Sequence, residues 1–159
     1  MKRIRTVEPP QGLARLLYRM PIVFYRAGLG WMLGKRFVFL THTGRRSGKT
    51  RQTVLEIIRR DIEGQTLYVV SAFGDKADWY QNILAQPEVN IQVSKKKAQA
   101  IAHPLPIEDA VQEMQRYYQA HPRLLTMLVR VVGYEIRNEN DVQELSAHIP
   151  VVKLQIISK

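Results

Sequence analysis

The stretch "LTHTGRRSGKTRQTVLEII", residues 40–58, limits the possible folds of this chain more than any other segment. It nearly spells a Walker A motif, but only three residues separate Gly44 from Gly48, where that motif requires four. A phosphate loop of that kind also leads from a strand into a helix. Here the flanking segments "KRFVFL" and "RQTVLEIIRR" are both rich in β-branched and aromatic residues. The pattern therefore predicts a loop between two strands and argues against a nucleoside triphosphatase.

Further strand-forming segments predict a mainly β domain with flanking helices, of the α+β class. "DIEGQTLYVVSAF" returns as a strand after a turn, and "VNIQVS" and "AQAIAH" alternate as two strands joined at Lys95, Lys96 and Lys97. We expect strands at about 36–42, 51–59, 66–72, 89–94, 98–103 and 149–157. We expect helices after Gly74 and ending near Pro87, and at 106–120, 122–132 and 140–147. Six strands with few long crossovers predict an antiparallel barrel.

The size and composition of the chain predict one domain, residues 1–159, with a helical N-terminal segment at 1–33 and the barrel and its helices at 34–159. The absence of cysteine excludes disulfides, thiolate metal sites and cysteine nucleophiles, and fits a cytoplasmic protein. The four histidines have no metal-ligand spacing, so we expect no metal site. Arginines interrupt the early apolar residues, so we expect no cleavable signal and no transmembrane run.

The N-terminal segment "GLARLLYRMPIVFYRAGLGW" repeats apolar residues at helical spacing, while its arginines fall away from that stripe. Pro21 predicts a break between two helices. Two interpretations stay open. Residues 11–33 either pack on the domain as a helix pair or form a basic amphipathic segment that contacts a membrane surface.

Positive charge is concentrated in the first sixty residues, which hold fourteen Lys or Arg and only Glu8 and Glu56, while the remaining 99 residues hold ten basic and twelve acidic residues. Such a distribution attracts nucleic acid, anionic lipid or an anionic small molecule. Single-strand nucleic-acid binding needs exposed aromatic rings. Tyr18, Tyr25 and Trp31 lie on or near the predicted apolar helix face, which favours their burial, so we expect no nucleic-acid partner.

Four cations, Arg45, Arg46, Lys49 and Arg51, crowd a loop that also contains two glycines and Ser47. Glycine lets the backbone approach a ligand closely, and arginine pairs bidentately with phosphate or carboxylate. Mutual repulsion among these cations favours an anionic partner over a solvated hairpin tip.

The second motif, "DWYQN" at residues 78–82, places Trp79 and Tyr80 at the start of a short helix. Aromatic rings with polar handles can sandwich a flat heterocycle. Taken alone, such a pair is more often part of a hydrophobic core, and Asp78 can serve simply as a helix N-cap.

Together, TGR-x-SG-x-x-R and DWY-x-N-x-x-A-x-P, followed by "IPVVKLQI", resemble in order and spacing the deazaflavin-dependent nitroreductase and quinone reductase family. The resemblance extends from about residue 36 to 157 and is weakest between 104 and 148. It implies a split β-barrel like that of flavin-binding oxidoreductases, and coenzyme F420 as the cofactor. This 5-deazaflavin carries a flat ring, a phosphodiester and an oligoglutamate tail.

The resemblance also implies roles for individual residues. The phosphate and neighbouring carboxylates are expected at Arg45, Arg46, Ser47, Gly48, Lys49 and Arg51. The ring and ribityl region are expected at Leu55, Ser71, Ala72, Trp79, Tyr80 and Asn82. Hydride would pass from C5 of the reduced deazaflavin to a quinone, an activated alkene or a nitro compound, with Ser71 or Tyr134 as the candidate proton donor.

Three departures from the family pattern concern the loop and the acceptor. Thr50 stands where relatives commonly carry proline, and Glu56 stands where prodrug-activating members carry an aromatic residue. The turn "SAFGDKADWY" is shorter than in those members. The acceptor is therefore not transferred from them, and we expect Glu56 to alter the acceptor pocket.

Two alternatives remain. One is an FMN- or haem-binding protein with the same barrel, although FMN, with one phosphate, needs fewer than four cations. The other is a non-enzymatic binder of nucleic acid or anionic membrane. A peripheral membrane contact is compatible with a reductase, since quinones reside in the bilayer, and a homodimer is expected from the superfamily alone.

Overall fold

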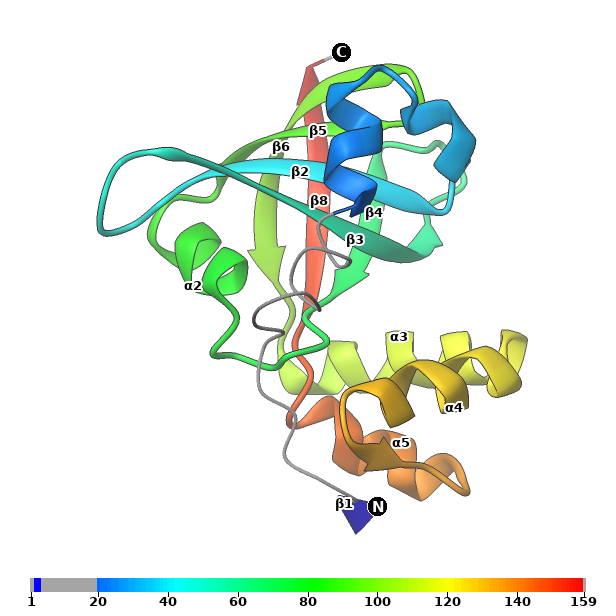
Figure 1. Cartoon of the computed structure of the whole chain (residues 1–159). Helices are drawn as coiled ribbons and strands as arrows, with labels where there is room; N and C mark the ends of the chain where they lie inside the picture. The colour runs from blue at the N-terminus through cyan, green and yellow to red at the C-terminus, as the bar shows by residue number, and fades with distance from the viewer. Residues whose placement is uncertain (1, 4–19, 159) are drawn as a thin grey trace.

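In the computed structural model, residues 2–3 and 20–158 are described. Six strands close an antiparallel barrel, shown in Figure 1. In their order around the barrel they are β2 (Phe37–Thr43), β3 (Thr50–Arg60), β4 (Thr66–Val70), β8 (Val151–Ser158), β6 (Lys96–Pro104) and β5 (Glu88–Val93). This confirms the predicted antiparallel barrel of six strands and the α+β class.

Alternation along the strands fills the barrel interior, because successive side chains of a strand point to opposite faces. On β2, Val38 and Leu40 point inward, and on β3 Leu55 and Ile57 do so. The other strands add the rest of this buried core: Leu67, Val69, Val89, Ile91, Ala100, Ala102, Val152 and Leu154, with Ile83 from a helix outside the barrel.

Two strand boundaries differ from the expected ones. β4 ends at Val70, two residues early, because Ser71 begins a turn in which the Gly74 N–H donates to the Ser71 carbonyl oxygen at 2.8 Å. The turn between β5 and β6 lies at Ser94 and Lys95, and Ser94 takes a left-handed φ of 54° there. Lys96 and Lys97 already belong to β6.

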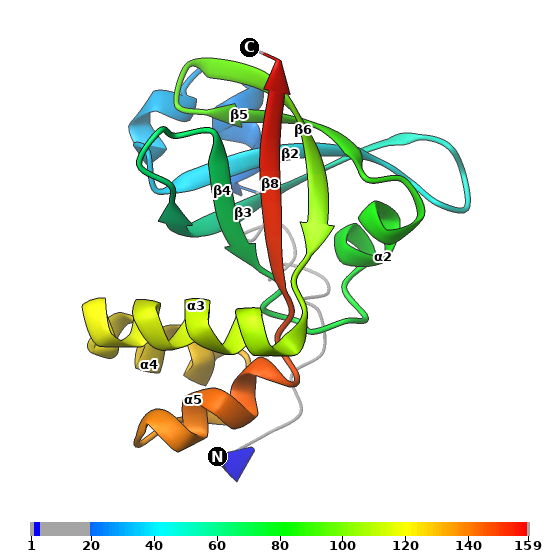
Figure 2. The ribbon, with the colours of Figure 1, turned by 180° about the vertical axis from the view of Figure 1, so that it is seen from behind.

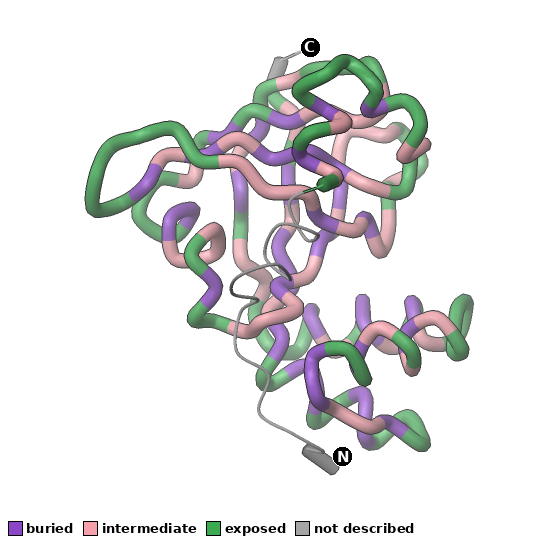
Figure 3. The backbone as a smooth tube through the Cα atoms, viewed as in Figure 1, coloured by how far each residue is buried: buried purple, intermediate pink, exposed green. Residues whose placement is uncertain are grey.

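The β2–β3 hairpin contains β3, the longest strand of the barrel. Its register runs without a shift from Phe37 opposite Glu56 to Thr43 opposite Thr50. The hairpin projects past the end of the barrel as an arm in Figures 1 and 2, and its tip is exposed in Figure 3. The loop after β2 therefore leads into a strand, as predicted, and begins no helix.

Three helices form a second layer at one end of the barrel, as Figure 2 shows: α3 (Ile107–Ala120), α4 (Pro122–Val131) and α5 (Glu139–Ser146). Their apolar faces form a separate core around Met114, Val142 and Leu145. Between α4 and α5, β7 (Tyr134–Glu135) pairs with β1 (Lys2–Arg3). Sequence analysis missed this sheet, because strands of two residues carry no periodicity.

Polar contacts tie α3 to the outer face of β3. The Arg59 guanidinium donates to both carboxylate oxygens of Glu113, at 2.5 and 2.9 Å, and lies 3.9 Å from the Tyr68 ring centroid. The Tyr117 hydroxyl donates to Glu56 at 2.8 Å, and burial together with this bond raises the pKa of Tyr117 to about 12. These contacts fix the helical layer to the barrel.

The N-terminal segment packs on the outside of β2. Residues 20–26 are helical, and Tyr25 stacks on Phe39 with ring centroids 5.0 Å apart. A short helix, η1 (Gly30–Leu33), follows. A Cβ on Gly30 would lie 2.4 Å from the Tyr25 ring, so only glycine fits there. Pro21 lies within these helical residues, and the helix predicted to precede it lies outside the described residues.

Part of the predicted N-terminal segment, including Tyr18 and residues 11–19, lies outside the described residues. Tyr25 is buried as expected, but the expected burial of Trp31 is wrong, since that side chain is 51% exposed. Trp31 belongs to η1, not to a continuous helical stripe, so helical spacing did not set its orientation. Within the described part of the chain, no helix is long and apolar enough to span a membrane.

The link between α3 and β3 gives a stability prediction. Glu113→Ala leaves the Arg59 guanidinium, only 32% exposed, without its carboxylate partner. We expect the free energy of unfolding to fall by about 2 kcal/mol, measured by urea denaturation with an unchanged m-value. The matched control is Arg116→Ala, which removes an exposed partner of the same carboxylate and should cost less than about 1 kcal/mol. Equal losses for the two variants would contradict the assigned role of Glu113.

Candidate functional site

The tip of the β2–β3 hairpin is a defined turn. The Gly44 N–H donates to the Lys49 carbonyl oxygen at 2.8 Å, and the Gly48 N–H donates to the Gly44 carbonyl oxygen at 2.8 Å. Gly48 has a φ of 64°, in the left-handed region that favours glycine. We call residues 44–49, together with Arg51 at the start of β3, the basic loop.

The cations of the basic loop fall into two groups. Arg45 is directed toward the protein, where its guanidinium lies 3.2 Å from the carboxylate of Asp78. Arg46, Lys49 and Arg51 are exposed, and none of them forms an ion pair with a described residue. Three like charges without an internal carboxylate on a structured turn have the chemistry needed to bind an anion.

A short helix is hydrogen-bonded to the basic loop. α2 (Asp78–Ala85) presents Asn82, whose Oδ1 accepts from the Arg45 backbone N–H at 3.0 Å and from Arg45 Nη1 at 3.0 Å. Its Nδ2 lies 3.2 Å from His42 Nδ1. Asn82 is 5% exposed, so its hydrogen bonds go to the protein. The interpretation of Asn82 as a cofactor ligand stays a prediction, and the geometry assigns it the anchoring of the loop.

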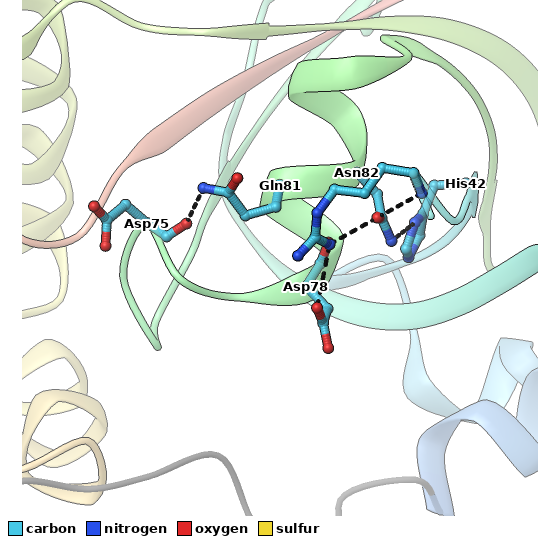
Figure 4. A network of polar contacts seen from close by, with 6 residues as sticks. His42, Asp75, Asp78, Gln81 and Asn82 are labelled. Atoms are coloured by element: carbon cyan, nitrogen blue, oxygen red, sulfur yellow. Dashed lines mark hydrogen bonds and ion pairs between the residues drawn. The ribbon is translucent and has the colours of Figure 1, made fainter. Parts of the chain in front are cut away.

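His42 is the member of this group that sequence analysis left without a role. It is 5% exposed and lies opposite Arg51 in the β2–β3 register. Burial, and next the charge of Arg51, lower the pKa of His42 to about 4. The alternation of Val38, Leu40 and His42 on β2 was the signal that this histidine points inward. Figure 4 shows His42 beside Asn82.

The turn after β4 forms the other end of the site. Ser71 is fully buried, and its hydroxyl donates to the Gly74 carbonyl oxygen at 2.6 Å. Gln81 of α2 donates to the Asp75 carbonyl oxygen at 2.7 Å, which ties this turn to α2, as Figure 4 also shows. The α2 helix thus bridges the basic loop and the turn.

A pocket of about 310 Å³ opens beside that turn. The two candidate proton donors, Tyr134 and Ser71, differ in whether they line this pocket. Tyr134 lines it and stacks on His148, with centroids 6.4 Å apart and planes 8° apart. Ser71, the first residue of the turn, is not among the residues that line the pocket. The residues that line the pocket are Ala72, Phe73, Gly74, Asp75, Lys76, Val132, Tyr134, Ala147, His148 and Pro150.

The remaining predicted residues lie nearer the barrel. Trp79 and Tyr80 are half-buried, pack on the barrel core and meet edge to face at 6.0 Å. Burial raises the pKa of Tyr80. Leu55 is 8% exposed inside the barrel. Hydrogen bonds thus join the basic loop, α2 and the turn, while Leu55 belongs to the barrel core.

Glu56 is not among the residues that line this pocket, and its expected effect on the acceptor pocket stays a prediction. It lies on the outer face of β3, where it accepts from Tyr117 and from Arg36 at 2.7 Å. Among the described residues, no group of three or more His, Cys, Asp or Glu residues is arranged to hold a metal ion.

Sequence comparison gives one family. A model of the F420H(2)-dependent quinone reductase family matches residues 17–152. Among curated proteins, no sequence is similar enough to count as a match.

Solved structures with the same fold come from proteins of low identity. An F420-H2 dependent reductase, FDR-A, is 22% identical, with 76% of this chain and 95% of that chain covered and a TM-score of 0.52. A protein described as a domain-swapped dimer is 21% identical, with 85% and 99% covered and a TM-score of 0.52. A pyridoxamine 5'-phosphate oxidase-related, FMN-binding protein from Nostoc punctiforme is 10% identical, with 92% and 82% covered and a TM-score of 0.56.

The lowered pKa of His42 gives a pH prediction. The neutral form is favoured in the folded protein, because the folded pKa of about 4 lies below the ordinary value of 6.5. The unfolded chain therefore binds the proton first as the pH falls. We expect the contribution of His42 to the free energy of unfolding to be full above about pH 6.5 and to be lost as the pH falls toward about 4. Urea denaturation at several pH values measures this, and His42→Asn, which does not titrate, should have a shallower slope. Identical slopes for the two proteins would contradict the burial of a neutral histidine.

Proposed function

The chain belongs to the F420H2-dependent quinone reductase family, and from this membership we propose that it binds F420 along α2 and transfers hydride to a quinone-type acceptor. The chain is an F420H2-dependent reductase, and F420 is its cofactor. The observation that carries the assignment of the binding site is the basic loop, whose three exposed cations have no carboxylate partner among the described residues.

The residues present fit this cofactor. An elongated molecule with a flat ring at one end and several anionic groups at the other needs a long surface with cations at one end. The basic loop supplies the cations beside Asn82, and the turn after β4 with its pocket lies on the other side of α2, beside Gln81. FMN, with a single phosphate, would leave most of the loop charge unpaired, which makes it the second choice.

We assign the anionic part of F420 to Arg46, Lys49 and Arg51, with the Ser47 hydroxyl as a further donor. Ser47 and Gly48 shape the turn, and Arg45 holds it to α2. The ring region is assigned to Ala72, Trp79 and Tyr80, whose half-buried faces exclude water. When bound, reduced F420 supplies a hydride from C5.

The protein must then orient the acceptor and supply a proton, since a quinone that accepts a hydride needs one proton to become a quinol. The Ser71 hydroxyl already donates to Gly74, which favours a role in holding the turn. Tyr134 lines the pocket, so we propose its phenol as the proton donor. Activated alkenes and nitro compounds are the other acceptors to be tested. We also propose a homodimer, supported by the structurally similar domain-swapped dimer.

A fluorescence titration with oxidised F420, run in parallel with FMN, tests the cofactor site. We expect F420 to bind with a dissociation constant of about 1 μM or lower and FMN far more weakly. Arg46→Ala should weaken F420 binding by about tenfold or more, because a charge-assisted contact is lost. The matched control is Arg123→Ala, an exposed arginine on α4.

Tight FMN binding would retain the barrel and the redox role but replace the cofactor. If Arg46→Ala and Arg123→Ala bind F420 equally well, the basic loop is not the anion site.

A second role is favoured by the exposed apolar side chains of residues 20–33. Around η1, five large apolar side chains are exposed: Met20, Val23, Leu29, Trp31 and Met32. The Lys95 ammonium lies 5.9 Å from the Trp31 ring centroid, and the sequence contains no acidic residue between Glu8 and Glu56. Apolar side chains with cations around them suit the interface of an anionic bilayer. We propose that this surface attaches a cytoplasmic protein weakly to the membrane in which a quinone resides.

Co-sedimentation with vesicles that contain anionic lipid tests this role. The double variant Trp31→Ser, Met32→Ser should remain largely in the supernatant, while the full chain sediments in part and less so at high salt. Ile107→Ser, which removes an equally exposed apolar side chain on α3, is the control and should sediment like the full chain. Unchanged sedimentation of the double variant would exclude this surface.

A further inference from the structure

The side-chain carboxamide of Asn82 has an oxygen that accepts hydrogen bonds and an NH₂ group that donates them. The neighbouring groups determine how the carboxamide is oriented. The groups of Arg45 that approach it, a backbone N–H and a guanidinium nitrogen, can only donate. The oxygen of Asn82 must therefore face Arg45, and the NH₂ group must face His42 Nδ1 at 3.2 Å. Figure 4 shows His42 and Asn82 in this arrangement.

This arrangement sets the protonation of His42. Because Asn82 donates to it, Nδ1 must carry a lone pair, so the imidazole is neutral with its proton on Nε2. The charged groups around His42 are Arg51 on the paired strand, Asp78 on α2, and Arg45 on the far side of Asn82. Burial and Arg51 favour the neutral form, and Asp78, which is 90% exposed, opposes it only weakly.

We propose that His42 is a positioning residue of the cofactor site, which holds the Asn82 carboxamide so that its oxygen anchors Arg45 and thereby the basic loop. The proposal rests on the proposed function of that loop. His42 is buried, and its side chain is linked to Arg45 through Asn82, so its effect is on the position of Arg46 and Lys49 and not on the reacting atoms.

The order of the contacts explains how one hydrogen bond acts on the whole loop. The backbone N–H of Arg45 is fixed by Asn82, and the next N–H groups along the chain belong to the turn closed by Gly44, Gly48 and Lys49. A rotated carboxamide would place NH₂ against the donors of Arg45 and release that first peptide group. The cations would remain, but their positions would no longer be fixed, which weakens binding more than it slows the hydride step.

The first test uses the protein without cofactor. Long-range ¹H–¹⁵N NMR of the imidazole rings, with His42→Asn to assign the signals, should show His42 as the neutral Nε2–H tautomer at pH 7 and still neutral at pH 5. A proton on Nδ1, or a charged ring at pH 6, would overturn the proposal whether or not F420 binds.

The second test measures F420 affinity and steady-state kinetics for two variants of His42. His42→Leu removes the acceptor and should weaken oxidised F420 binding about tenfold, with KM for F420H2 raised and kcat within about twofold of the wild type. His42→Asn offers an oxygen near the position of Nδ1 and should restore most of the affinity. Circular dichroism confirms that each variant is folded.

A double-mutant cycle with Asn82→Ala separates positioning from a general loss of packing. Because His42 acts through Asn82, His42→Leu should have no further effect on affinity in the Asn82→Ala background. Additive losses would overturn the proposal, as would equal affinity of His42→Leu and wild type. If wild-type protein does not bind F420, the proposed function fails, while the NMR measurement still decides the state of His42.

Discussion

Closure of the barrel by β8 is the constraint on which the rest of the structure depends. This last strand pairs with β4 on one side and β6 on the other, so every strand of the barrel has two partners. Closure leaves no open edge in the barrel sheet, and it encloses one apolar core. It also fixes the helical layer. Since α3, α4 and α5 connect β6 to β8, and these strands are neighbours, the layer must begin and end at the same side of the barrel.

The candidate cofactor site is formed by segments that do not take part in closing the barrel. The β2–β3 hairpin continues past its neighbours, so its tip is free to carry charge. α2 lies outside the barrel and contributes Ile83 to the core, while its polar face holds Arg45 and Asp75. Repulsion among the loop cations disfavours a tight turn, and the bonds from Asn82 and between Gly44 and Lys49 oppose that repulsion. A loop held in this way is organised before an anion arrives.

Much of the fold follows from local patterns. Strand-forming residues, with alternation in two of the segments, predicted all six barrel strands. Strand formers on both sides of residues 44–49 also argued correctly against a P-loop. The pairing of β1 with β7 could not be predicted, because it joins two-residue segments that are distant in sequence. Helical periodicity also failed to predict that Trp31 is exposed, because Trp31 lies in a short 3-10 helix.

For the candidate site, the sequence identified the charged residues but not the different contacts that each of them makes. Charge density marked the basic loop, yet only the structure separates Arg45, which is bonded to α2, from Arg46, Lys49 and Arg51. The sequence indicated no role for His42, because its partner Asn82 lies in another element and no short spacing connects the two residues. Strand alternation places Glu56 on the outer face of β3, where it accepts from Tyr117, and its expected effect on the acceptor pocket stays a prediction.

A crystal structure of the protein with oxidised F420 tests the central claim most directly, namely that the basic loop and α2 form one cofactor site. The account predicts the phosphodiester within hydrogen-bond distance of Arg46, Lys49 or Arg51. It also predicts the ring beside the turn after β4 and the Asn82 oxygen still bonded to Arg45. A phosphodiester bound elsewhere, with these cations facing only solvent, would contradict it.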